Sequence, residues 1–121
     1  MALVLDAMGS DRHPVPEIEA AIAFAKETNE KIYLVGHRDV VFSAAKESDF
    51  DGLPIEFVHA EDILDSDAKA VSSFKEKPNN SMAVGLRLVR EGKAEGFLTN
   101  GSTGAALFAA LRILGRVKNV S

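Results

Sequence analysis

Short apolar runs alternate with segments of helical periodicity along this chain, and the alternation constrains the fold more than any other feature. Four segments have the length and apolar content of buried strands: residues 3–5, 31–36, 54–59 and 96–99. Strands separated by helices imply right-handed crossovers and a mostly parallel sheet with helices on both faces. We therefore expect a doubly wound α/β fold.

The segments between these runs predict the helices. Pro16 suits the first turn of a helix in which Ile18, Ile22 and Ala25 recur at helical spacing. Gly92 is a natural stop for another helix. The remaining periodic segments predict a short helix around 40–45 and longer helices over 67–77, 80–91 and 103–114.

Length and composition limit the class of protein. A chain of 121 residues suits one domain spanning 1–121, and 46% hydrophobic with 26% charged residues is ordinary for a globular protein. The net charge of −4 argues against a general nucleic-acid binder, which would need a basic face. The absence of Cys suits a reducing compartment, and the chain starts on a strand-like segment without a basic leader, so we expect a cytoplasmic protein.

A Gly-rich turn, Asn100–Gly104, joins the last strand-like run to an apolar helical segment. It contains Asn100, Gly101, Ser102, Thr103 and Gly104. Backbone N–H groups at a helix start lack intrahelical partners and favour anions, so this turn is a candidate site for phosphate or a carboxylate. The alternative is an ordinary strand-to-helix turn in which Ser102 or Thr103 caps the helix.

A second polar loop follows the first strand. Asp6 and Asp11 could serve acid–base chemistry or hold a ligand, and Gly9 would allow close approach of a bound group. The alternative is that both carboxylates only accept hydrogen bonds within turns. Because parallel strands end at one edge of a sheet, we expect this loop to face Asn100–Gly104.

Two further groups of residues are weaker candidates. Lys77 and Ser81 flank the start of the helix over 80–91 and could form a second anion clamp, although exposed lysines are commonly just solvated. His13, His37 and His59 are scattered along the sequence, and the carboxylates at positions 6 and 11 have no third ligand nearby. We therefore predict no metal site and no cofactor.

Several motifs occur together in an informative order. Asp6–Asp11 reads D-A-M-G-S-D, and Val58–Glu61 is followed by Asp67, Lys69, Lys77 and Ser81. Gly92–Ala94, Gly101–Ala105 and Gly115–Lys118 complete the series. In this combination the chain resembles the amino-terminal portion of the phosphate acyltransferase family (PlsX type) of bacterial membrane-lipid synthesis, in which the first motif is normally D-A-M-G-G-D.

The resemblance implies a fold similar to that of the isocitrate and isopropylmalate dehydrogenases, of which residues 1–121 would form an amino-terminal part, because family members are longer. It implies an enzyme that moves a fatty acyl group from acyl carrier protein to inorganic phosphate, giving acyl phosphate for phospholipid synthesis. The phosphate-binding residues would be Asp6, Gly9, Asp11, Lys77, Ser81, Asn100, Gly101, Ser102, Thr103 and Gly104. No catalytic base is assigned. The full-length form would be a homodimer with a peripheral membrane contact outside these residues, and the 121 residues alone are expected to be inactive.

Two alternatives stay open. The chain could be a non-catalytic domain that binds an anion or metabolite, which would suit the altered residues Ser10, Asn100 and Ser102. It could also be similar to a phosphotransacetylase that acts on acyl coenzyme A.

Overall fold

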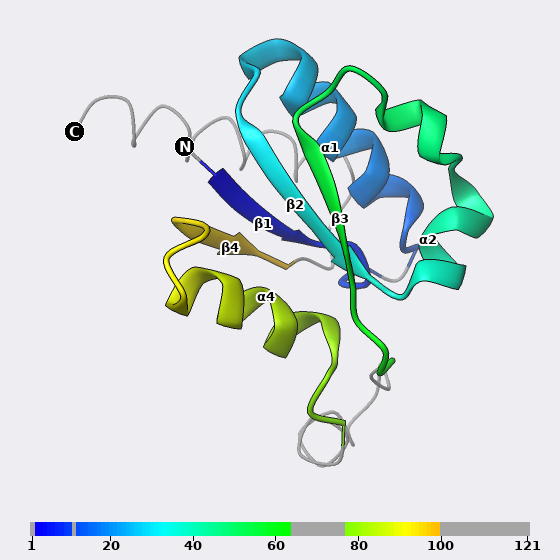
Figure 1. Ribbon diagram of the computed structural model, residues 1–121. Coiled ribbons are helices and arrows are strands. Elements are labelled where there is room, and N and C mark those ends of the chain that lie inside the picture. The colour runs from blue at the N-terminus through cyan, green and yellow to red at the C-terminus, as the bar shows by residue number, and fades with distance from the viewer. Residues whose placement is uncertain (1, 11, 64–76, 100–121) are drawn as a thin grey trace.

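The computed structural model describes residues 2–10, 12–63 and 77–99 (Figure 1). Its centre is a sheet of four strands, all of whose pairings are parallel. The strands are β1 (Ala2–Asp6), β2 (Lys31–Gly36), β3 (Ile55–His59) and β4 (Gly96–Leu98). Each lies within a residue or two of its predicted position, so the α/β class predicted from the alternating pattern is confirmed.

Helices cover both faces of this sheet. Helices α1 (Val15–Thr28) and α2 (Arg38–Ala44) lie on one side and α4 (Ser81–Arg90) on the other, as Figure 1 shows. A 3₁₀ turn, η1 (Glu47–Phe50), links α2 to β3. Gly92, with φ +79°, follows the end of α4 and supports the predicted stop. Positions 67–76 of one predicted helix and the whole of the helix predicted over 103–114 lie outside the described residues.

The α1 face holds the larger part of the core. Phe24 of α1 is fully buried, and Leu5, Ile32 and Leu34 of the sheet pack in the same cluster. Ile18 and Ala25 are buried and Ile22 is partly buried, which confirms the apolar side predicted for this helix. Burial of apolar area of this kind is the main favourable term in folding.

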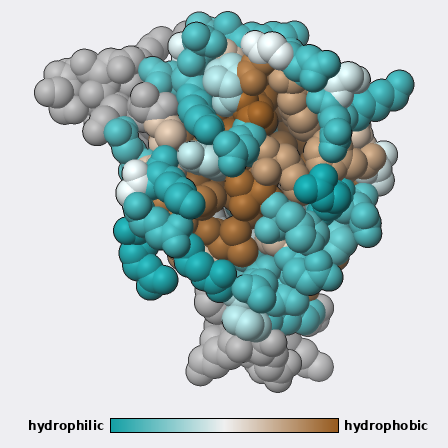
Figure 2. All heavy atoms as spheres, in the orientation of Figure 1, coloured by the Kyte–Doolittle hydropathy of each residue, from teal (hydrophilic) through white to brown (hydrophobic). Residues whose placement is uncertain are grey.

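The α4 face depends on a close approach of helix to sheet. Gly85 lies at the contact, where an added Cβ would come within 2.4 Å of the Phe97 ring and 3.0 Å of Val4. Helix α4 contacts β1, β2 and β4, and β3 and β4 are the two outer strands of the described sheet. Figure 2 shows apolar side chains in a central band of the visible face, bordered by hydrophilic residues.

The strand order fixes where a ligand would meet this fold. The order is β3-β2-β1-β4, so the chain moves outward from β1 in one direction and then returns to place β4 on the other side of β1. The order reverses between β1 and β4, and in doubly wound sheets ligands bind at such a switch point, outside the carboxyl ends of the strands. Among the described residues no helix is long and apolar enough to cross a bilayer.

Candidate functional site at the carboxyl edge of the sheet

One buried carboxylate, that of Asp6, links the two strand ends at the switch point. Asp6 ends β1, and its Oδ2 accepts a hydrogen bond of 2.7 Å from the Thr99 hydroxyl, just beyond β4. Its Oδ1 accepts a hydrogen bond of 2.9 Å from the Met8 amide. Asp6 is only 2% exposed. We call Asp6, Met8 and Thr99 the Asp6 corner, and it joins two segments that are 93 residues apart in the sequence.

The loop after Asp6 folds back onto the start of α1. The Ser10 amide donates a hydrogen bond of 2.8 Å to Glu17 Oε2, and the Ser10 carbonyl accepts from the His13 amide at 3.1 Å. The His13 ring Nδ1 lies 2.7 Å from the same carbonyl. Glu17 is fully buried, and within the described part of the chain its Oε1 and the Ser10 hydroxyl have no hydrogen-bond partner. Gly9 is half-buried and directly follows Met8 of the Asp6 corner.

The start of α4 is held by its own polar side chains. Asn80 caps the helix, because its Oδ1 accepts from the Ala83 amide at 2.9 Å while its Nδ2 donates to the Lys77 carbonyl at 2.7 Å. Ser81 is the first helical residue and is 5% exposed. The Lys77 ammonium donates to the Ile63 carbonyl at 2.8 Å. Lys77 and Ser81 therefore both lie at the start of α4, and the lysine ammonium is engaged by a backbone carbonyl. Their role as an anion clamp stays a prediction.

Six of the predicted site residues lie outside the described part of the chain: Asp11, Asn100, Gly101, Ser102, Thr103 and Gly104. The structure does place Thr99, the residue before the Gly-rich turn, in contact with Asp6. The chain thus enters that turn beside the loop that contains Met8 and Gly9. The binding roles of all these residues remain predictions.

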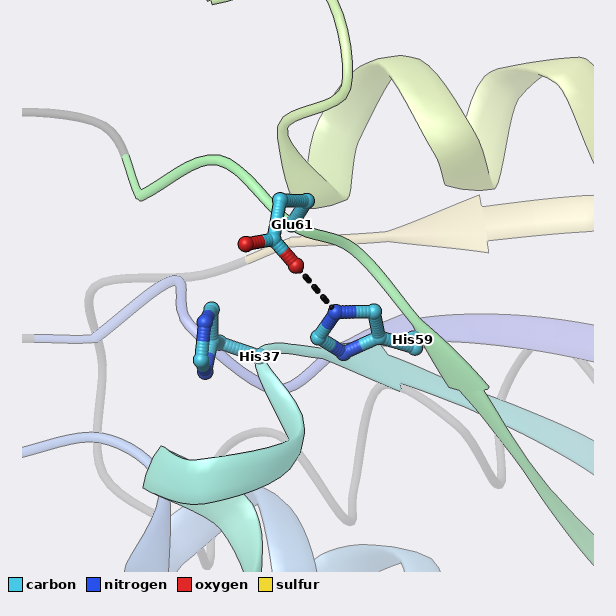
Figure 3. A group of neighbouring side chains, drawn as sticks. All are labelled: His37, His59 and Glu61. Atoms are coloured by element: carbon cyan, nitrogen blue, oxygen red, sulfur yellow. Dashed lines mark hydrogen bonds and ion pairs between the residues drawn. The ribbon is translucent and has the colours of Figure 1, made fainter.

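A second polar group at this edge was not predicted from the sequence. His37 follows β2, His59 ends β3, and Glu61 lies two residues beyond it; we call these three the histidine cluster (Figure 3). The two imidazole rings are 5.0 Å apart between centroids and meet edge to face. His59 Nε2 lies 2.7 Å from Glu61 Oε2. His37 and His59 are scattered along the sequence but lie together in the fold.

Backbone amides determine which ring nitrogens carry protons in this cluster. The Arg38 amide donates to His59 Nδ1 at 3.0 Å, and the Asp39 amide donates to His37 Nδ1 at 3.2 Å, which caps α2. In a neutral imidazole the nitrogen that accepts has no proton, so the proton lies on Nε2 in both rings. His59 thus donates from Nε2 to Glu61, and this hydrogen bond is the main cause that lowers the pKa of Glu61.

The signal for this cluster was present in the sequence. His37 and His59 each stand at the end of a strand-like run, and β2 and β3 are parallel neighbours in which Gly36 pairs with His59. Parallel neighbours deliver the residues at their carboxyl ends to the same place. His37, His59 and Glu61 can each offer a metal-ligating atom, and these atoms all lie within 4.8 Å of one another.

Comparison with known proteins decides the family. A family model described as "Fatty acid synthesis protein" matches residues 1–121, the whole of the sequence. The chain belongs to this family.

Its relatives carry a consistent name. The chain is 43% identical over 121 residues to a phosphate acyltransferase of Koribacter versatilis, covering 99% of this chain and 34% of that protein. It is 42% identical over 119 residues to the phosphate acyltransferase of Acidobacterium capsulatum, covering 98% and 35%. It is 34% identical over 120 residues to that of Clostridioides difficile, covering 99% and 35%. The chain therefore spans about a third of the length of these relatives.

Proposed function

We propose that this chain is part of a phosphate acyltransferase that moves a fatty acyl group from acyl carrier protein to inorganic phosphate, giving acyl phosphate for phospholipid synthesis. The relatives that share its sequence over 98–99% of its length carry the name phosphate acyltransferase. The observation that carries the proposal is the contact between Asp6 and Thr99 at the switch point of the sheet, where α/β folds bind ligands.

The proposed reaction has simple requirements. An oxygen of hydrogen phosphate attacks the thioester carbonyl, the new C–O bond forms, the C–S bond breaks, and the phosphate proton ends on the departing thiol. The enzyme must orient phosphate against the carbonyl and stabilise the oxyanion that develops there. In this proposal the backbone amides of Asn100, Gly101, Ser102, Thr103 and Gly104 do both.

The Asp6 corner has a positioning role in this proposal. Both Asp6 oxygens accept hydrogen bonds from the chain itself, one from Met8 and one from Thr99. Asp6 thereby fixes the point at which the backbone leaves β4 for the Gly-rich turn. Gly9 and Asp11 would form the facing wall, while Lys77 and Ser81 would add positive charge and a hydroxyl at the start of α4.

The remaining parts of the proposal concern the longer protein. The chain would supply one α/β domain, and the other two thirds of a protein as long as its relatives would supply the rest of the acyl-chain site, the homodimer contacts and a peripheral membrane contact. We propose a cytoplasmic enzyme without a cofactor. The 121 residues alone are then expected to form no acyl phosphate from acyl carrier protein thioester and phosphate.

Phosphate titration of the chain, followed by amide chemical shifts, tests the binding half of the proposal. We expect saturable shifts confined to residues 99–104 and to the loop around Met8 and Gly9. Titration with chloride at matched ionic strength is the control, because a screening effect would move exposed amides in both titrations. If the turn stays silent in phosphate, or if chloride reproduces its shifts, the proposed phosphate site is wrong.

A further inference from the structure

We propose that the histidine cluster is a binding site for a divalent transition-metal ion, with the imidazoles of His37 and His59 and the carboxylate of Glu61 as ligands. The site shares no residue with the proposed phosphate site, and the inference does not depend on acyl transfer. It concerns a group that the fold assembles from three segments of the carboxyl edge: the end of β2, the end of β3 and the residues that follow it (Figure 3).

The geometry already brings the ligand atoms together. One ligating atom from each of the three residues lies within 4.8 Å of the other two, and His59 Nε2 and Glu61 Oε2 are 2.7 Å apart. Two imidazole nitrogens and one carboxylate oxygen are a donor set that suits Zn²⁺ and its neighbours in the first transition row. The harder ions Mg²⁺ and Ca²⁺ prefer oxygen ligands, so the cluster should discriminate against them.

The charges and access around the cluster also favour a cation. Glu61 is 72% exposed at its side chain and His59 is 35% exposed, so an ion can enter directly from solvent. The nearest cationic side chain in the sequence, Arg38, is turned elsewhere: its guanidinium lies 5.0 Å from the centroid of the Phe57 ring and 3.7 Å from Glu47.

Metal binding at this place would compete with the start of α2. Both Nδ1 atoms now accept hydrogen bonds from the amides of Arg38 and Asp39. A metal on Nε2 of a neutral imidazole leaves the ring proton on Nδ1, which can then only donate, and a metal on Nδ1 displaces the amide directly. In either case the amide loses its acceptor. Metal binding therefore predicts a local change at the first turn of α2.

A Zn²⁺ titration of the full chain tests the site, with calorimetry for affinity and amide chemical shifts for location. We expect one equivalent to bind, with shifts at His37, His59, Glu61 and the amides of Arg38 and Asp39. His59→Gln and Glu61→Gln should each raise the dissociation constant by about tenfold or more. Mg²⁺ should cause no comparable shifts.

Two further variants separate loss of a ligand from loss of structure. His37→Asn removes the imidazole but keeps a side-chain oxygen that can cap α2, so it should weaken Zn²⁺ binding while the helix stays formed. His13→Gln is the matched control, because His13 is the remaining one of the three histidines and contacts the Ser10 carbonyl instead. It should bind Zn²⁺ as the parent chain does.

Three outcomes would overturn the inference. Zn²⁺ could fail to bind at millimolar concentration, it could bind equally well to the His59→Gln and Glu61→Gln variants, or His13→Gln could abolish binding. The second and third would place the ion elsewhere on the chain. A bound ion that leaves the amides of Arg38 and Asp39 unshifted would overturn the coupling to α2.

Discussion

The Asp6 corner and the histidine cluster lie at the same edge of the same sheet, yet they use a carboxylate in opposite ways. Asp6 is 2% exposed, and each of its two carboxylate oxygens accepts a hydrogen bond from its own chain. Glu61 is 72% exposed at its side chain and accepts a hydrogen bond from His59. A buried carboxylate with satisfied oxygens holds a loop in place, whereas an exposed one beside two imidazoles is available to a ligand.

The positions of the strands explain this difference. Asp6 ends β1, which has neighbours on both sides, so residues from β4 and from its own loop surround it. His59 ends β3, an edge strand with β2 as its neighbour in the described sheet. The central strand end is enclosed by the fold, and the edge strand end faces solvent. We expect substitutions at the first to act on stability and substitutions at the second to act mainly on binding.

Among the substitutions that test this difference, Asp6→Ala should change the free energy of unfolding most. It removes the acceptor for the Met8 amide and the Thr99 hydroxyl at a buried position, and we expect a loss of about 2–4 kcal/mol in the free energy of unfolding. Thr99→Val removes only one of the two hydrogen bonds and should cost about 1 kcal/mol. Urea unfolding measures both. Equal losses for the two variants would contradict the double role of Asp6.

Gly36→Ala tests the backbone between the two regions. An added Cβ would lie 3.1 Å from Ala7 Cβ, 3.1 Å from Val41 Cγ2 and 3.4 Å from Met8 Cγ. We expect the free energy of unfolding to fall by about 1 kcal/mol. Alanine lowers the conformational entropy of the unfolded chain, which favours folding, but the crowding in the folded state is the larger effect. Amide shifts should change on both sides, at Met8 and in α2. An unchanged unfolding midpoint together with unchanged shifts would show that the neighbours yield without cost.

His37→Ala should have a smaller effect, because the cap it removes is at an exposed end of a short helix. We expect a loss of about 0.5–1 kcal/mol from the missing acceptor for the Asp39 amide. His37→Asn should stay within about 0.5 kcal/mol of the parent chain, since asparagine also caps helices well. Urea unfolding of the two variants is the measurement. If both lose the same amount, the imidazole contributes by packing on His59 and not by capping.

The smallest effect is the pH dependence of the contact between His59 and Glu61. The folded state lowers the pKa of Glu61, so this contact favours folding above the pKa of an unfolded Glu and the benefit disappears as pH falls through the lower folded value. Carboxyl carbon shifts in buffer with a chelator measure the folded pKa. His59→Gln should raise it toward the ordinary value of Glu. The same pKa in both chains would show that His59 is not the cause.

Much of the fold follows from local sequence pattern. The run Lys31–Gly36 is apolar enough to be recognised as a strand, and its predicted limits are those of β2. Pro16 and the spacing of Ile18, Ile22 and Ala25 identify α1, because an amphipathic helix shows its buried side directly in the sequence. Pattern alone could not show that Gly85 lets α4 approach Phe97, because that contact joins two elements and needs their placement.

The site was predictable only where strand ends were considered together. Parallel strands place their carboxyl ends at one edge, and this reasoning predicts that the Asp6 loop faces Asn100–Gly104. The structure places Thr99 against Asp6, whereas the turn itself lies outside the described residues and its position stays a prediction. The same reasoning extends to His37 and His59, which stand at the carboxyl ends of the neighbouring strands β2 and β3. The hydrogen bonds that the amides of Arg38 and Asp39 donate to these rings depend on side-chain rotamers, which sequence does not specify.

The position of β4 has a consequence for the order in which the chain folds during synthesis. Strands β1, β2 and β3 and the helices between them use only the first 59 positions of the sequence, while β4 pairs with β1 across a far longer loop. Closing long loops is slow because the chain entropy is lost before the contacts form. On a ribosome, we expect the first half of the sequence to pack around α1 while the edge of β1 that later pairs with β4 is still unpaired, because β4 has not yet been synthesised.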